Sequence, residues 1–129
     1  MFKNPSNGNI GIGHVRWATH GIPNIINAHP HSSEKVSVVH NGIIENSDEL
    51  KKDLEEKGFK FKSQTDTEVI TVLVTQFLEN SNPLKSVFKT LKKLKGSFAL
   101  GIIFKDFPDI IIGARRGSPL AVGLSLIHI

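Results

Sequence analysis

The sequence predicts one α+β domain whose strands pair antiparallel. Segments of strand character cluster before and after a helical block. Apolar residues make up 39% of the 129 residues and charged residues 22%, a balance typical of a globular chain. At this length we expect at most one domain.

Two strands and a long loop are predicted in the first third of the chain. Ile10–Arg16 alternates apolar and small residues, and Val36–His40 is a short apolar run, so both are predicted as strands. Residues 17–35 carry Gly21, Pro23 and Pro30 among several His and Asn residues, which predicts a long ordered loop. A loop of this length is usually functional or disordered.

Three helices are predicted in the middle of the chain. The first is capped by Asn46 or Ser47 and ends at Gly58, and the second is capped by Thr65 or Asp66. The third follows Pro83. Apolar residues recur at helical spacing in the second helix at Val69, Ile70, Leu73, Val74, Phe77 and Leu78, and form one face of the third at Leu84, Val87, Phe88, Leu91 and Leu94.

Further strands are predicted around and after the helices. Phe59–Lys62 alternates and is predicted as an edge strand. Ser97–Phe104 and Asp109–Ala114 are predicted to pair as a hairpin, with a turn around Phe107-Pro108. Leu120–Val122 is predicted to start another strand.

Composition excludes several classes of function. The net charge is +4, but the lysines lie among acidic residues and without interleaved aromatics, which indicates a solvated surface and no nucleic-acid partner. The chain has no Cys, hence no disulfide and no thiolate metal site. No apolar run approaches the length of a membrane span, and the first residues lack the apolar core of a signal peptide. We therefore expect a cytoplasmic protein.

Two charged residues have the chemistry to bind an α-amino acid. Arg16 carries the planar fork of donors that suits a carboxylate, although a lone Arg is more often part of a salt bridge. Asp66, in QTDTE, is either a helix cap or the acceptor of a substrate ammonium. Each residue alone is weak evidence, and their joint occurrence favours the amino-acid site.

The pair Asn41-Gly42 has two interpretations. After a buried strand it is typical of a plain turn, which the pair alone favours. The alternative is an oxyanion hole, in which a side-chain amide and a backbone N–H aim at one point.

Histidines crowd the loop of residues 17–35. His20, His29 and His31 could ligate a metal ion, and a metal-dependent hydrolase is an alternative function. Hydrogen bonding that shapes the loop is the more common role for such rings, and we predict no metal site.

Five motifs resemble one enzyme family. GHVRWATHG (13–21), NAHPH (27–31), HNGIIEN (40–46), TDTEVI (65–70) and RRGSPLAVG (115–123) are similar to the glutaminase domain of the glutamine–fructose-6-phosphate aminotransferases, a branch of the class II glutamine amidotransferases. The resemblance covers Gly11–Gly123. It implies an Ntn-hydrolase fold, an α/β/β/α sandwich of two antiparallel sheets between helical layers, and hydrolysis of glutamine to glutamate and ammonia without a cofactor.

The resemblance also implies roles for individual residues. Arg16 would grip the α-carboxylate of glutamine and Asp66 its α-amino group, while Asn41 and the N–H of Gly42 would form the oxyanion hole. Thr19 and His20 would line the same pocket, and Trp17 would belong to a loop that closes over it. In the whole enzyme, ammonia would pass to a sugar-phosphate isomerase domain and aminate fructose 6-phosphate to glucosamine 6-phosphate, in a homo-oligomer.

The chain departs from the family pattern in its chemistry. The family nucleophile is an N-terminal Cys whose free α-amine is the base, and this sequence has no Cys. We therefore expect residues 1–123 to be an incomplete glutaminase domain that is inactive alone. The alternative is a natural amino-acid-binding module without catalysis. The last residues, 124–129, match the translation of a sequencing-library adaptor, and we expect them to be non-native.

Overall fold

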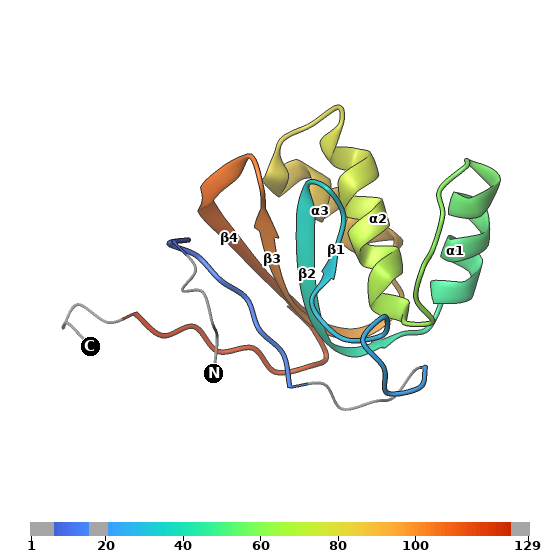
Figure 1. Cartoon of the computed structure of the whole chain (residues 1–129), viewed down its shortest axis with the longest axis horizontal. Coiled ribbons are helices and arrows are strands. Elements are labelled where there is room, and N and C mark those ends of the chain that lie inside the picture. Colours follow the sequence, from blue (N-terminus) through green and yellow to red (C-terminus); the bar gives the residue numbers. More distant parts are fainter. Residues whose placement is uncertain (1–6, 16–20, 125–129) are drawn as a thin grey trace.

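The structure, a computed structural model, describes residues 7–15 and 21–124, and it confirms the α+β prediction. Within these residues, four antiparallel strands form one sheet in the order β1-β2-β3-β4, and helices cover one of its faces (Figure 1). The elements are β1 (His31–Ser32), β2 (Val36–Ile44), α1 (Ser47–Glu56), α2 (Asp66–Leu78), α3 (Pro83–Lys93), β3 (Gly96–Phe104) and β4 (Phe107–Arg116).

The hydrophobic core lies between the sheet and α2. Alternate residues of the two central strands point to the helices, because successive side chains of a strand face opposite ways. On the strands, the buried members are Val36, Val38, Ile44, Phe98, Leu100, Ile102 and Phe104. Val69, Ile70, Leu73 and Val74 of α2 pack against them, as the helical spacing predicts, whereas Phe77 and Leu78 are only partly buried.

The N-caps of α1 and α2 are residues that the sequence predicts as caps, whereas the cap of α3 was not predicted. Thr65 is the N-cap of α2, and Asp66 is the first helical residue. Asn82 caps α3 through its side chain, which accepts from the backbone N–H of Lys85 at 2.9 Å. Asn46 precedes α1 without a capping hydrogen bond, because its carboxamide instead bonds to the end of α3, where it donates to the carbonyl of Lys93, and to the residue Lys95 beyond it, whose N–H it accepts.

The predicted apolar face of α3 is partly wrong. Val87 and Leu94 are buried, but Leu84 is 69% exposed and Phe88 58% exposed. The side of α3 that meets the core carries Ser86 and Thr90 next to Val87, and both hydroxyls donate to carbonyls of the same helix. Because both hydroxyls have hydrogen-bond partners within the helix, Ser86 and Thr90 can be buried at little cost. They occupy the core-facing side of α3, where the apolar pattern predicted Leu84 and Phe88.

Three predicted strands do not form in the described residues. Ile10–Val15, the described part of the first, crosses the sheet without pairing, and Leu120–Val122 is also irregular, with Leu120 lying against Gly113. The segment Phe59–Lys62 is bound to helices rather than to a strand: Phe59 N–H donates to the carbonyl of Leu54, and Lys62 N–H donates to Glu68.

The hairpin prediction is confirmed, with its turn displaced. β3 and β4 pair from Phe98↔Arg116 to Phe104↔Phe107. The turn is therefore Lys105-Asp106, and Pro108 lies inside β4, where an edge strand tolerates its missing N–H.

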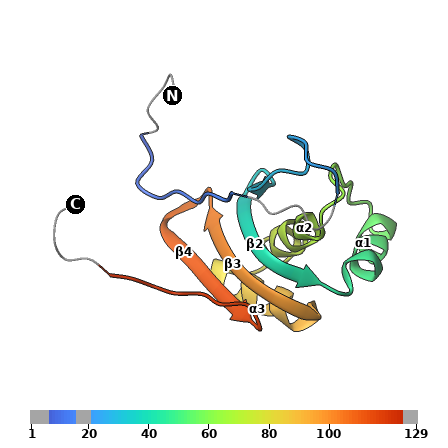
Figure 2. The same ribbon diagram turned by 90° about the horizontal axis from the view of Figure 1, so that it is seen from below.

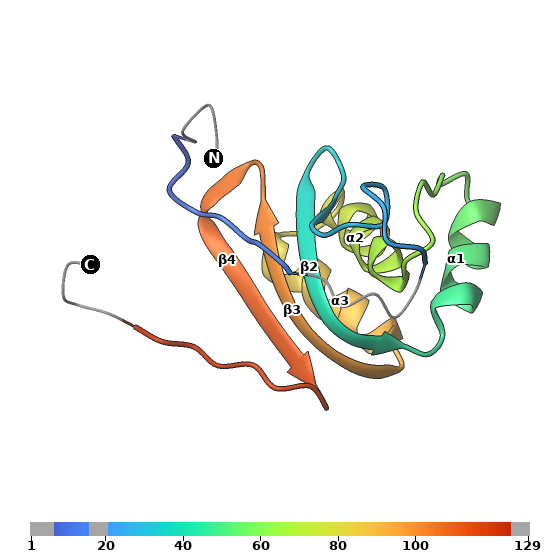
Figure 3. The same cartoon turned by 60° about the horizontal axis from the view of Figure 1, so that its bottom comes forward.

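Among residues 7–15 and 21–124, no helix covers the second face of the sheet. Chain segments from the two ends lie on this side, and the N-terminal segment runs across β4 and β3 toward β2 (Figures 2 and 3). Ile12 reaches Gly101 there, while Ile43 stays 45% exposed and Ile111 56% exposed. The described residues thus contain one sheet and its helices, which is half of the predicted two-sheet sandwich.

Candidate functional site

Asn41 and Gly42 lie inside a strand, so the interpretation of this pair as a turn is wrong. β2 continues without a break from Val36 to Ile44, and Asn41 and Gly42 pair with Ala99 and Phe98 of β3. The strand continues because β3 offers a partner along its whole length.

Gly42 is the residue that the backbone needs at this position. Its φ is +131°, a conformation that L side chains rarely adopt. A Cβ at Gly42 would also collide with the backbone carbonyl of Ser97 in the neighbouring strand. The pairing of β2 with β3 at this point therefore excludes any side chain.

The pairing pattern directs the N–H of Gly42 away from β3. The hydrogen bonds just outside the two ends of the β2–β3 pairing involve odd-numbered residues. At one end Glu45 N–H donates to the carbonyl of Lys95, and at the other Lys105 N–H donates to the carbonyl of Lys35. In an antiparallel pair the even-numbered residues then point their N–H groups to the opposite edge. On that edge β1 pairs only with Ser37 and Val38, so neither strand of the ladder engages Gly42 N–H.

Asp66 lies at the same edge of β2. Its Oδ2 accepts the N–H of Ile44 at 2.8 Å, two residues beyond Gly42 and on the same side of the strand. The carboxylate is 7% exposed, and Oδ1 lies 3.9 Å from Nδ1 of His40. The first turn of α2 thus holds a buried carboxylate against the strand that carries Asn41 and Gly42, and Oδ1 retains capacity to accept a further donor.

Thr67 joins two of the histidines. Its hydroxyl lies 3.0 Å from Nε2 of His29 and 3.0 Å from Nδ1 of His40. His31 meets the hydroxyl of Thr65 at 2.7 Å. The residues around the N-terminus of α2 therefore bind the loop histidines by hydrogen bonds.

The described histidines do not assemble a metal centre. Over residues 7–15 and 21–124, no group of three His, Cys, Asp or Glu side chains could hold a metal ion. His29 and His31 are engaged by threonines, and their rings meet edge to face with centroids 5.0 Å apart. His20, the third residue of the metal alternative, lies outside the described residues.

His14 meets Asn41 across the open face of the sheet. Nε2 of His14 lies 2.7 Å from Oδ1 of Asn41. The His14 ring stacks on that of His29 with centroids 4.3 Å apart. The N-terminal segment is thereby tied to the strand that carries Asn41.

The structure brings together three of the predicted site residues, Asn41, Gly42 and Asp66, at one edge of β2. The remaining four, Arg16, Trp17, Thr19 and His20, lie outside the described residues. Sequence reasoning gave no role to His14, His40 or Thr67. The only signal for them was their position inside or beside the motifs at 13–21, 40–46 and 65–70.

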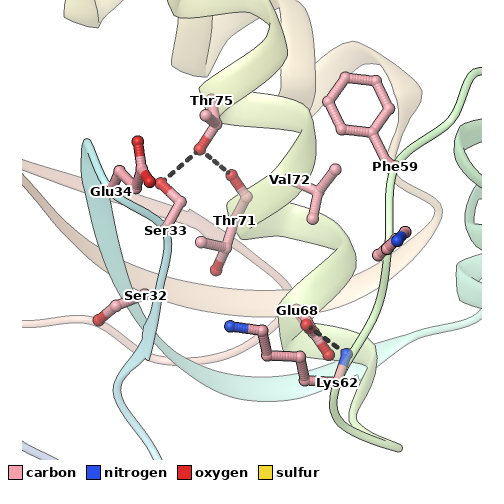
Figure 4. A pocket seen from close by; sticks show the side chains of 10 residues that line it. Ser32, Ser33, Glu34, Phe59, Lys62, Glu68, Thr71, Val72 and Thr75 are labelled. Atoms are coloured by element: carbon pink, nitrogen blue, oxygen red, sulfur yellow. Dashed lines mark hydrogen bonds between the residues drawn. The ribbon is translucent and has the colours of Figure 1, made fainter.

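A groove of about 480 Å³ lies elsewhere, on the outer side of α2. It runs between Ser33 and the segment of Phe59 and Lys62, and Thr75 forms part of its wall (Figure 4). Ser33 and Thr75 hydrogen-bond to each other, and Lys62 N–H donates to Glu68. These wall groups are paired with one another, and none of the predicted site residues lines the groove.

Comparison with known proteins decides the family. The family model described as "Glutamine amidotransferase domain" matches residues 22–120. The chain belongs to this family. The predicted resemblance is confirmed, and the matched residues contain Asn41, Gly42 and Asp66.

Curated relatives of this amidotransferase domain carry a more specific name. The chain is 55% identical over 122 residues to a glutamine–fructose-6-phosphate aminotransferase (isomerizing) of Mesorhizobium japonicum, which covers 94% of this chain and 20% of the relative. It is also 55% identical over 125 residues to the enzyme of that name from Clostridium acetobutylicum, covering 95% of this chain and 20% of the relative. The chain thus spans about a fifth of the length of these relatives.

Solved amidotransferase structures share the fold. A glutamine phosphoribosylpyrophosphate amidotransferase from B. subtilis superposes with a TM-score of 0.63 at 29% identity, over 79% of this chain and 22% of that one. A second structure, described as the allosteric regulatory enzyme of purine biosynthesis, gives 0.58 at 31% identity, over 71% of this chain and 21% of that one. The α+β fold is that of the Ntn-hydrolase amidotransferases, as predicted. No helix in the described part of this amidotransferase chain is long and apolar enough to cross a membrane.

Proposed function

We propose that this chain forms the glutamine-recognition part of a glutaminase domain that supplies ammonia for the amination of fructose 6-phosphate. The observation that carries the proposal is the edge of β2, where Asp66 accepts the N–H of Ile44, two residues beyond Gly42, whose own N–H the alternation of an antiparallel strand turns to the same side. A backbone donor and a buried carboxylate at one edge suit the two ends of a glutamine, its side-chain carbonyl and its α-ammonium.

Each residue has a defined part in this proposal. Asn41 and the N–H of Gly42 donate to the oxygen of the glutamine carboxamide, whose negative charge grows when a nucleophile attacks the carbonyl carbon. Asp66 accepts the α-ammonium through Oδ1, and Arg16 pairs with the α-carboxylate. Trp17, Thr19 and His20 line the same pocket.

The chain lacks the nucleophile for this reaction. Attack on the glutamine carbonyl requires a thiolate in this family, and the sequence contains no Cys. We therefore propose that residues 1–123 act as part of a longer cytoplasmic, homo-oligomeric enzyme, with a Cys and a sugar-phosphate isomerase domain supplied by other segments. Residues 124–129 are proposed to be foreign to that enzyme.

The deciding experiment transfers the recognition residues into an active enzyme. Residues 11–123 replace the corresponding segment of the Clostridium acetobutylicum relative, which is 55% identical over 125 residues. We expect the chimera to release ammonia from glutamine, and Arg16→Ala to raise its KM for glutamine. A charge-assisted pair contributes about 1.5–3 kcal/mol, which corresponds to roughly 10- to 150-fold in KM.

Controls separate recognition from folding. Lys57→Ala, an exposed cation at the end of α1, is expected to leave the KM unchanged. If Arg16→Ala also leaves the KM unchanged, the assigned role of Arg16 is refuted. If a folded chimera shows no ammonia release, the proposal that this segment belongs to a working glutaminase fails.

The missing Cys favours one second candidate, a natural amino-acid-binding module without catalysis. Both candidates predict that glutamine binds, so binding cannot distinguish them. The genomic reading frame does: an in-frame Cys directly after a start Met upstream supports the glutaminase, and an intact frame without one supports the binding module.

A further inference from the structure

We propose that His14 is a positioning residue that orients the carboxamide of Asn41 for transition-state stabilisation. This inference rests on the proposed function, in which Asn41 donates to the oxyanion. The observation behind it is the 2.7 Å contact between Nε2 of His14 and Oδ1 of Asn41. The two residues are 27 positions apart, so the contact is a product of the fold and not of local sequence.

The chemistry of a carboxamide makes this contact directional. The oxygen of Asn41 can only accept, so Nε2 of His14 carries the proton and donates it. With the oxygen held by His14, the NH₂ group of the same carboxamide is turned away from His14 and keeps both of its protons for other acceptors. A carboxamide rotated by half a turn would present its oxygen where the oxyanion forms, and two partial negative charges would then repel each other.

The ring of His14 is itself held in place. It stacks on the ring of His29 with centroids 4.3 Å apart and planes 27° apart. His29 in turn contacts the hydroxyl of Thr67, a residue of α2 that is completely buried. The orientation of Asn41 is thereby linked, through two rings, to the same helix turn that presents Asp66.

The two oxyanion donors are held in place in different ways. Gly42 donates through its backbone, whose direction the ladder of β2 and β3 already fixes. Asn41 donates through an exposed side chain that could rotate about its own bonds. An external partner is therefore needed for Asn41 and not for Gly42, and His14 is the partner that the structure supplies.

The test uses an active full-length glutaminase that carries residues 11–123 of this chain. In it, His14→Phe keeps a flat ring that can stack on His29 but removes the donor. We expect kcat for ammonia release to fall roughly 10- to 100-fold, since complete loss of an oxyanion donor costs about 100- to 1,000-fold. The KM for glutamine is expected to change less than about twofold, because Asp66 and Arg16 bind the other end of the substrate.

Two further variants make the result specific. His14→Gln can donate from Nε2 at similar reach, and we expect it to recover most of the lost kcat. The double variant His14→Phe with Asn41→Ala is expected to be no slower than Asn41→Ala alone, because a positioning residue has nothing left to position. A merely structural role for His14 would instead add its loss to that of Asn41→Ala and would not respond to Gln.

The outcomes separate this inference from the proposed function. If Asn41→Ala leaves kcat unchanged, the oxyanion role fails and the proposed function fails with it. If Asn41→Ala is slow while His14→Phe matches the parent enzyme, only the role of His14 is overturned. Additive losses in the double variant overturn it as well. Should His14→Phe not fold, the comparison of His14→Gln with the parent still decides, because a kcat reduced 10-fold or more in the folded Gln variant contradicts the inference.

Discussion

The carboxylate of Asp66 accepts the backbone N–H of Ile44 at 2.8 Å and so fastens the start of α2 to the end of β2. Both groups are buried, with Asp66 7% exposed and Ile44 1%. The acceptor therefore has a structural task, whatever it binds in addition. Removing it leaves a buried donor without its partner, which is the costly way to lose a hydrogen bond.

The first prediction concerns this link. We expect Asp66→Ala to lower the free energy of unfolding by about 1–3 kcal/mol, because the N–H of Ile44 loses its acceptor. Urea denaturation followed by circular dichroism measures the change. Asp66→Asn is the matched control, since its carboxamide oxygen can still accept from Ile44, and it should cost clearly less. Equal losses for the two variants would show that charge, and not the hydrogen bond, matters here.

The second prediction concerns the strand glycine. Gly42→Ala places a methyl group against the carbonyl of Ser97 at a φ of +131°, so the chain must bear both strain and collision. We expect a loss of at least about 3 kcal/mol in the free energy of unfolding. Gly58→Ala is the control, because Gly58 has a φ of +91° but open space around it.

The control isolates the collision from the strain. Gly58→Ala should cost only about 1–2 kcal/mol, the cost of the left-handed conformation alone. Both variants can be measured by the same denaturant titration. A Gly42→Ala protein as stable as Gly58→Ala would mean that β3 yields to the added methyl group.

Much of the fold follows from local patterns, and the exceptions have physical causes. The cap at Thr65 and the hairpin of β3 and β4 are visible in the sequence because they depend on neighbouring residues. The strand character of Asn41-Gly42 is not visible, because it comes from pairing with residues more than 50 positions away. Local turn propensity is simply outweighed by that distant partner.

In the candidate site, too, local patterns were visible in the sequence and distant contacts were not. Asp66 could be singled out from its position before a helix, but its contact with Ile44 depends on how α2 meets the sheet. The roles of His14 and Thr67 depend on side chains brought together from three segments. No spacing rule connects such residues, and only the recognised motifs hinted that they belong together.

The third prediction tests which side of α3 faces the core. Val87 is buried, so Val87→Ala should lower the free energy of unfolding by about 2 kcal/mol through lost apolar burial and the cavity left behind. Phe88, its neighbour, is 58% exposed, and we expect Phe88→Ser to change the stability by less than about 0.5 kcal/mol. The comparison uses thermal or urea unfolding. A larger loss for Phe88→Ser than for Val87→Ala would mean that the side of α3 that carries Phe88 faces the core, contrary to the structure.

The fourth prediction concerns catalysis by the chain as it stands. With no Cys in the sequence, we expect the 129-residue protein to release no ammonia from glutamine above a heat-treated control. A coupled glutamate dehydrogenase assay over several hours provides the sensitivity. Turnover well above the control would require another nucleophile. It would overturn the proposal that this chain supplies glutamine recognition while another segment supplies the nucleophile.

The last prediction concerns the hydroxyl of Thr67, which contacts His29 and His40 at 3.0 Å each. Thr67→Val keeps the shape of the side chain but removes the polar atom from a fully buried position. We expect a loss of about 1–3 kcal/mol in the free energy of unfolding, because two imidazole nitrogens, one of them in the buried ring of His40, lose a partner at once. Thr75→Val is the control, since Thr75 is only partly buried and its hydroxyl bonds to Ser33 and to its own helix.

In an active glutaminase that carries this segment, Thr67→Val should also lower kcat, whereas Thr75→Val should not, because only Thr67 contacts His29, whose ring stacks on the His14 ring that contacts Asn41. Equal kcat values for these two variants would disconnect α2 from the orientation of Asn41.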